Sequence, residues 1–122
     1  MYELDVTREF SAAHHLCGYN GNCAKTHGHN WTVQIFIQCS KLDDVGIAMD
    51  FKILKKELDE VLEGLDHSDL NQHEAFQDKN PTSENIAEYI YKFLSGRINT
   101  ENRKVSRVRV CESGNSGASY FE

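Results

Sequence analysis

Two stretches of the chain alternate between apolar and polar residues, and histidines lie at one end of each. Residues 2–14 carry apolar side chains on one parity, with Arg8 as the exception: Leu4, Val6, Phe10 and Ala12. Residues 29–39 carry apolar side chains on the odd positions, namely Trp31, Val33, Ile35 and Ile37. Phe36 is the exception, an apolar residue on an even position. Because successive side chains of a strand point to opposite faces, both stretches are predicted to be strands with one buried face.

Three histidines fall in the buried phase of these strands. His14 continues the apolar parity of the first strand, whereas His15 falls on the polar side. If the second strand begins at His27, then His27 and His29 continue its buried phase, and their side chains lie about 6–7 Å apart on one side. Gly28 between them permits close backbone approach. Three converging imidazoles predict a metal site with an open fourth position, the catalytic arrangement for zinc. Iron, nickel or three unrelated structural histidines are the alternatives.

A cysteine precedes this histidine pair by four residues, and it has two interpretations. Cys23 could be a fourth ligand, which would close the site into a structural one. It could instead be a thiol activated by a nearby metal and histidine, and act as a base or nucleophile. Cys17 in the same loop is a rival candidate, whereas Cys39 and Cys111 lie in predicted strands and are expected to be packing residues.

The remainder of the chain predicts two helices followed by two strands. A helix capped by Asp50 carries an apolar stripe, and a second helix begins at Thr82 or Ser83. The first stripe contains Phe51, Leu54, Leu58, Val61, Leu62 and Leu65; the second contains Ile86, Ile90, Phe93, Leu94 and Ile98, with Tyr89 and Tyr91 off it. Strands are expected over 105–112 and 118–121. The order predicts an α+β fold with an antiparallel sheet and both helices on one face.

Three further side chains are candidates for chemistry. Glu112 lies in phase with the buried Val108 and Val110, so its carboxylate must be paired or recognise a ligand. Asp66 and His67 offer a base with a possible partner, although an exposed loop histidine is the simpler interpretation of their spacing.

Length and charge limit the possible functions. With 122 residues, the chain is expected to form one domain spanning 1–122. A formal net charge of -6 argues against binding to nucleic acid or anionic membranes, but local cations and a metal could still hold an anionic small molecule. The sequence shows neither a signal peptide nor a long apolar run, so a cytoplasmic protein is expected. A small chain that builds an active site often borrows surface from a second copy.

Several motifs, in order along almost the whole chain, resemble the 6-pyruvoyl-tetrahydropterin synthase superfamily. They are Phe10-Ser11-Ala12-Ala13-His14, Cys23-x-x-x-His27-Gly28-His29, Met49-Asp50-Phe51, Leu65-Asp66-His67-x-x-Leu70-Asn71, Pro81-Thr82-Ser83-Glu84-Asn85 and the late Glu112. The three-residue gap between Cys23 and His27 is similar to the bacterial branch, 6-carboxy-5,6,7,8-tetrahydropterin synthase of queuosine biosynthesis.

The resemblance implies a tunnelling fold, in which trimers form a β-barrel and two trimers stack into a hexamer with active sites between subunits. It implies zinc on His14, His27 and His29, Cys23 as proton acceptor and Asp66-His67 as relay. Glu112 would hold the pterin ring, and Lys25 is the only cation within a motif that could meet the triphosphate.

The implied reaction converts 7,8-dihydroneopterin triphosphate to 6-carboxytetrahydropterin, acetaldehyde and triphosphate. Formation of 6-pyruvoyl-tetrahydropterin, or cleavage of the dihydroneopterin side chain, are alternatives within the same fold. A non-catalytic structural zinc module, with Cys23 as fourth ligand, is an alternative of a different class.

Overall fold

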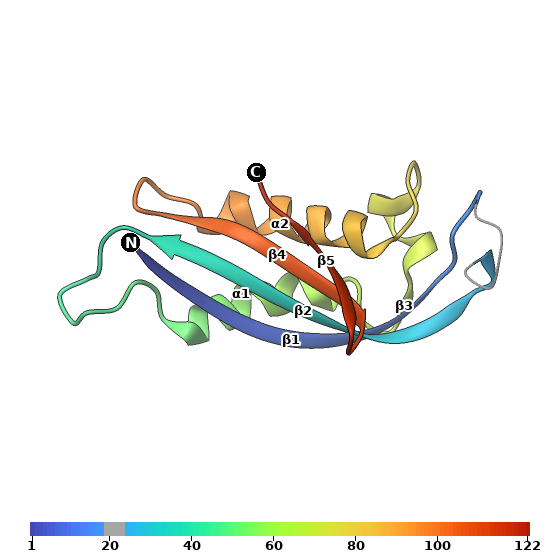
Figure 1. The fold of residues 1–122 in the computed structure, drawn as a ribbon, viewed down its shortest axis with the longest axis horizontal. Helices are drawn as coiled ribbons and strands as arrows, with labels where there is room; N and C mark the ends of the chain where they lie inside the picture. Colours follow the sequence, from blue (N-terminus) through green and yellow to red (C-terminus); the bar gives the residue numbers. More distant parts are fainter. Residues whose placement is uncertain (19–23) are drawn as a thin grey trace.

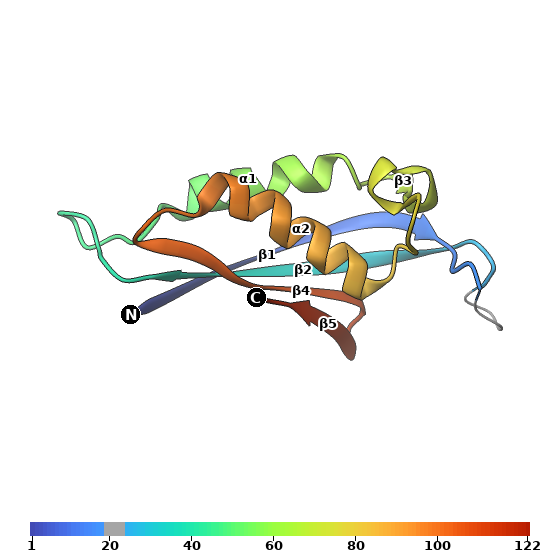
Figure 2. The same ribbon diagram turned by 90° about the horizontal axis from the view of Figure 1, so that it is seen from above.

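The computed structural model describes residues 1–18 and 24–122 and consists of a twisted sheet with helices on one side (Figure 1, Figure 2). The sheet has five strands in the order β3-β1-β2-β4-β5. They are β1 (Tyr2–His14), β2 (His27–Cys39), β3 (Ser68–Asp69), β4 (Arg103–Ser113) and β5 (Ser116–Tyr120). The helices are α1 (Phe51–Glu63) and α2 (Ser83–Ile98), with the short 3-10 helices η2 (Leu70–Gln72) and η3 (Glu74–Phe76) before α2. The α+β arrangement expected for the chain is confirmed, and β3 is an addition to it.

The core lies between the sheet and the two helices, as the alternation predicts. Val6, Phe10, Trp31 and Ile35 all point to the helix side and are buried. The two exceptions to the alternation have specific partners. Arg8 faces α1, where its Nε lies 3.0 Å from Oδ1 of Asp59.

Phe36, the second exception, lies on the opposite, helix-free face of the sheet. The guanidinium of Arg107 covers its ring at 4.0 Å from the ring centroid, which explains how a phenylalanine on this face is buried.

Both helix starts follow the predicted capping. The side chain of Asp50 accepts a hydrogen bond from the backbone N–H of Lys52 at 2.8 Å, and Thr82 accepts one from Asn85 at 3.1 Å.

Two predictions about the helix faces are wrong. Phe51 is 52% exposed because it occupies the first position of α1, at the end of the helix. Tyr91 is buried because its ring packs against Tyr120 of β5, with the centroids 5.1 Å apart.

Two features of the sheet position the site at one end. β1 and β2 pair without interruption as far as His14 opposite His27. β4 and β5 lose register between Val110 and Ser113, where β4 contains one more residue than its partner. Such a bulge bends the strand and redirects its side chains.

Among the described residues, no helix combines the length and apolar character needed to cross a membrane.

Candidate metal centre

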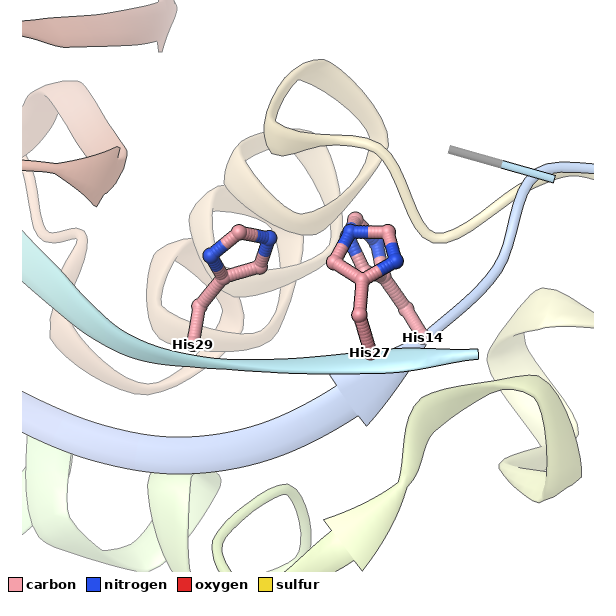
Figure 3. Close-up of side chains that lie close together, drawn as sticks. All are labelled: His14, His27 and His29. Carbon is pink, nitrogen blue, oxygen red and sulfur yellow. The ribbon is translucent and has the colours of Figure 1, made fainter. Parts of the chain in front are cut away.

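Three histidines meet on the helix side of the sheet, where β1 ends and β2 begins. His14 and His27 are direct cross-strand partners, and His29 follows two residues later on the same face of β2. Each ring offers one nitrogen to the group, and these nitrogens all lie within 4.8 Å of one another. Figure 3 shows the three rings standing together on one side of the two strands.

Backbone carbonyls fix two of the three rings. Nδ1 of His14 lies 2.8 Å from the carbonyl oxygen of Pro81, and Nδ1 of His27 lies 2.6 Å from that of Lys25. A carbonyl can only accept, so Nδ1 carries the proton in both rings. Each neutral ring then presents the lone pair of Nε2, which is the arrangement found in metal-binding histidines.

The remaining nitrogens fit a bound cation. Nε2 of His14 lies 3.1 Å from Nε2 of His27, so two lone pairs face each other. Nε2 of His29 is buried and has no hydrogen-bond partner among the described residues. Zinc–nitrogen bonds of about 2.0–2.1 Å in tetrahedral geometry separate ligand atoms by about 3.3–3.4 Å. The His14–His27 spacing is close to that value, and the donor set therefore fits a divalent metal such as zinc.

Burial keeps His14 in the form that binds metal. The residue is only 2% exposed, and its desolvation lowers the pKa of the ring below the usual 6.5, because the charged form is disfavoured. The ring of Trp31 packs edge-on against both His14 and His29, with centroids 4.9 Å and 5.2 Å away. The Trp31 indole N–H donates to the carbonyl of Ala12 at 3.1 Å, which fixes the indole ring beside the two histidines.

Glu112 stands beside the three rings. Its Oε2 lies 3.9 Å from Nε2 of His14 and 3.7 Å from Nε2 of His29. The side chain is 41% exposed, so the prediction of a buried carboxylate is wrong. Glu112 lies in the bulge of β4, near the end of the strand, where the regular pairing with β5 is interrupted. It borders a hollow of about 280 Å³ together with His14 and the first turn of α2.

Asp66 and His67 form a hydrogen-bonded pair. Nδ1 of His67 lies 2.9 Å from Oδ2 of Asp66. Oδ1 of Asp66 accepts the backbone N–H of Ser11 at 2.9 Å, and the backbone N–H of His67 donates to the carbonyl of Ser11. The Ser11 hydrogen bond, followed by that to His67, lowers the pKa of the Asp66 carboxyl. His67 adopts a left-handed backbone with φ of 54°, which is unusual for a residue other than glycine.

This pair lies apart from the three histidines within one chain. The His67 side chain is 83% exposed and borders a shallow hollow with Ser11, Ala13 and Asn30. Ser11 and Ala13 carry the parity of the helix-free face, although Ala12 and His29 also border this hollow. His67 is not among the three histidines whose nitrogens converge. The predicted dyad is therefore formed, but the chain does not bring it to its own metal centre.

The loop between β1 and β2 carries the remaining candidates. Cys23 lies outside the described residues. Lys25 is exposed, and its contact with the site is through its backbone carbonyl on His27. Cys17 is exposed, and its backbone N–H and carbonyl both bond the side-chain amide of Asn80, each at 2.9 Å.

Several residues that position the site have no chemical signature in the sequence. Pro81 belongs to the predicted helix start, yet its carbonyl orients His14. Asn71 bonds both the N–H and the carbonyl of His15 at 2.9 Å and 3.0 Å, in the same way that Asn80 holds Cys17. The asparagines in the Leu70-Asn71 and Asn80-Pro81 segments are the available signal, because a side-chain amide can pair with both backbone groups of one residue in an irregular segment.

The chain is similar to known proteins over almost its whole length. The sequence profile of the family described as 6-pyruvoyl tetrahydropterin synthase matches residues 3–122. A Bacillus subtilis protein named 6-carboxy-5,6,7,8-tetrahydropterin synthase is 35% identical over 115 residues, which cover 89% of this chain and 76% of the relative. A protein of the same name from Synechocystis is 33% identical over 123 residues and covers 95% and 92%. The structure of Caenorhabditis elegans 6-pyruvoyl tetrahydropterin synthase matches with a TM-score of 0.86 and 26% identity over 99% of this chain and 95% of that one.

Proposed function

Because this chain belongs to the 6-pyruvoyl tetrahydropterin synthase family, we propose that it is a zinc-dependent 6-carboxy-5,6,7,8-tetrahydropterin synthase of queuosine biosynthesis. Its substrate is 7,8-dihydroneopterin triphosphate, and its products are 6-carboxytetrahydropterin, acetaldehyde and triphosphate. The observation that carries this proposal is the group of three histidine nitrogens within 4.8 Å, beside a half-exposed carboxylate. Residues 1–122 act as one domain, in the cytoplasm.

The proposed zinc ligands are His14, His27 and His29. Zinc held there would supply a Lewis acid for the hydroxyl groups of the substrate side chain. The carbonyls of Pro81 and Lys25 orient two of the rings, so these residues prepare the site before metal arrives.

Glu112 is proposed to bind the pterin. Its carboxylate accepts hydrogen bonds from ring N–H and amino groups, and its position beside the histidines would bring the side chain of the pterin to the metal centre. Lys25 is the proposed contact for the triphosphate, since its side chain is exposed next to His27.

Proton transfer is assigned to Cys23, with Asp66 and His67 as a relay. The dyad is not part of the three-histidine group of its own chain, which supports a role in a site completed by a neighbouring copy. We therefore propose a homo-oligomer, a trimer closed into a β-barrel or a hexamer of two such trimers, with the active site shared between subunits.

Product identification tests the proposal. Zinc-loaded protein is incubated with 7,8-dihydroneopterin triphosphate, and the pterin products are separated and identified by mass. 6-Carboxytetrahydropterin with acetaldehyde is expected. 6-Pyruvoyl-tetrahydropterin, or a hydroxymethylpterin, would assign the chain to one of the other reactions of this fold. A chain that binds zinc but leaves the substrate intact would be a structural zinc module, and the His27→Ala variant gives the background rate.

A further inference from the structure

His14 is held in place by the segment that leads into α2, at the point where its own strand ends. His14 opposite His27 is the last pair of the β1–β2 ladder, and residues 15–18 lie beyond it. The buried contact of His14 is the carbonyl of Pro81, which accepts the Nδ1 proton at 2.8 Å across 67 positions of the chain. The orientation of the ring therefore depends on a fixed separation between the end of β1 and the start of α2.

The side chain of Asn80 connects this segment to the residues that follow β1. Its Oδ1 accepts the backbone N–H of Cys17 at 2.9 Å, and its Nδ2 donates to the carbonyl of Cys17 at 2.9 Å. The amide thus exchanges two hydrogen bonds with one residue, as a paired residue of an antiparallel strand does. Pro81 follows Asn80 directly in the chain, so the same two bonds restrain the carbonyl that His14 uses.

The backbone carbonyl of Asn80 is in turn held by the start of α2. Nδ2 of the half-buried Asn85, in the first turn of the helix, donates to this carbonyl at 2.8 Å. The backbone N–H of Thr82 donates to the same oxygen at 2.9 Å and closes a three-residue γ-turn around Pro81. Because the proline ring also fixes φ at about −65°, the Pro81 carbonyl has little freedom to turn.

Asn71 makes a similar pair of bonds, but it does not act on this carbonyl. It bonds the N–H and the carbonyl of His15 from η2, an element that does not contain Pro81. Asn80 is the residue that joins three parts of the metal centre: the end of β1, the start of α2 and the carbonyl on His14.

We infer that Asn80 and Asn85 are positioning residues for the metal centre. Acting in series, they connect α2 to the end of β1 and hold the Pro81 carbonyl on Nδ1 of His14. That carbonyl keeps the proton on Nδ1 and leaves the lone pair of Nε2 for a metal. Without the connection, the His14 ring turns or exchanges its proton between the two nitrogens, and fewer molecules present Nε2. The inference rests on the proposed zinc site and adds the residues that orient one of its ligands.

Competition with a chromogenic chelator measures the dissociation constant for zinc in each variant. Loss of a group that orients a metal-binding histidine lowers metal affinity by about 10–100-fold, and Asn80→Ala is expected to fall at the low end because Pro81 is kept. Asn85→Ala is expected to raise the constant by about 5-fold, since the Thr82 N–H still bonds the Asn80 carbonyl. Alanine keeps the backbone N–H that bonds Thr82 and favours the helix, so Asn85→Ala remains a test if Asn80→Ala unfolds.

The double variant and a distant asparagine separate this role from a general loss of stability. Because the two asparagines are links in series, the double variant is expected to bind zinc about as weakly as Asn80→Ala alone. Asn99→Ala is the matched control, since Asn99 accepts the backbone N–H of Val105 at 2.8 Å at the other end of α2. It is expected to lower the free energy of unfolding and to leave zinc affinity unchanged. Circular dichroism checks that every variant folds.

NMR of the imidazole nitrogens in the metal-free chain measures the tautomer of His14 directly. The parent chain is expected to carry the His14 proton on Nδ1, and both asparagine variants are expected to show a mixture of the two tautomers. His27 is the internal control, because the Lys25 carbonyl holds its Nδ1 in every variant. A loss of stability alone would not distinguish the two rings.

An unchanged dissociation constant for zinc or an unchanged His14 tautomer in the folded variants would overturn the inference. A multiplicative loss of affinity in the double variant would also overturn it, because the two asparagines would then act by separate routes. A parent chain that binds no zinc would contradict the proposed function instead, and the tautomer of His14 would still decide whether the asparagines orient the ring.

Discussion

The Nε2 atoms of His14 and His27 face each other at 3.1 Å, while the Nδ1 atom of each ring is bonded to a backbone carbonyl. Two nitrogens that both present lone pairs repel unless a proton or a cation lies between them. The carbonyl partners are part of the fold, so the chain holds the two rings in this arrangement before any ligand binds. The two backbone carbonyls thus hold the rings of His14 and His27 in the orientation that a metal ion requires.

The first prediction concerns metal content. His27→Ala removes one of three ligands, and a site with two protein ligands is expected to lose most of its zinc after dialysis against a weak chelator. Elemental analysis of the dialysed protein measures this. His15→Ala is the matched control, because His15 directly follows β1 and its ring nitrogens lie near Thr26 and Asn71 instead of joining the three histidines. Equal retention of zinc in the two variants would contradict the assignment of His27 as a zinc ligand.

The second prediction concerns the stability of the metal-free chain as a function of pH. Burial lowers the pKa of His14 below 6.5, so the unfolded state takes up the proton first as the pH falls. The contribution of His14 to the free energy of unfolding is therefore present above pH 6.5 and is lost below it. The pKa of Asp66 is lowered from 3.8, which adds a further loss in more acidic solution.

Urea unfolding of the chelated protein between pH 8 and pH 5 measures the His14 effect. His14→Gln should flatten the dependence within this range, whereas the parent chain should lose stability steadily. A parent chain that gains stability on acidification to pH 5 would contradict the prediction.

The third prediction separates pterin binding from metal binding. Glu112→Gln keeps the size of the side chain but removes its charge, and two charge-assisted hydrogen bonds contribute about 1.5–3 kcal/mol each. The dissociation constant for a product pterin is expected to rise by about 100-fold or more, with zinc content unchanged, because the three histidines suffice as ligands. Calorimetry measures the affinity, and a variant that binds pterin normally would exclude this role.

The fourth prediction concerns Cys23. As a base in proton transfer it should contribute about 10²–10⁴-fold to turnover and little to binding. Cys23→Ala is therefore expected to lower kcat by that factor while zinc content and pterin affinity stay near those of the parent. Cys17→Ala serves as the control, since the backbone rather than the thiol of Cys17 holds the loop. Loss of zinc and of thermal stability in Cys23→Ala would instead identify a structural fourth ligand.

The sequence by itself determined the strand phases, and with them the shared side of His14, His27 and His29. This was possible because the alternation of side chains in a strand follows from local backbone geometry, and because the uninterrupted β1–β2 ladder preserves it. The same local rules identified the caps at Asp50 and Thr82.

Only the tertiary structure decided what surrounds those residues. The carbonyl of Pro81 reaches His14 across 67 positions of the chain, and no local pattern encodes that contact. The bulge in β4 exposes Glu112 although its parity matches buried valines. Asp66 and His67 form their pair where the chain passes beside β1, because Ser11 donates to Asp66 and accepts from the backbone of His67. Each of these outcomes depends on how distant segments pack, whereas strand phase depends on neighbouring residues alone.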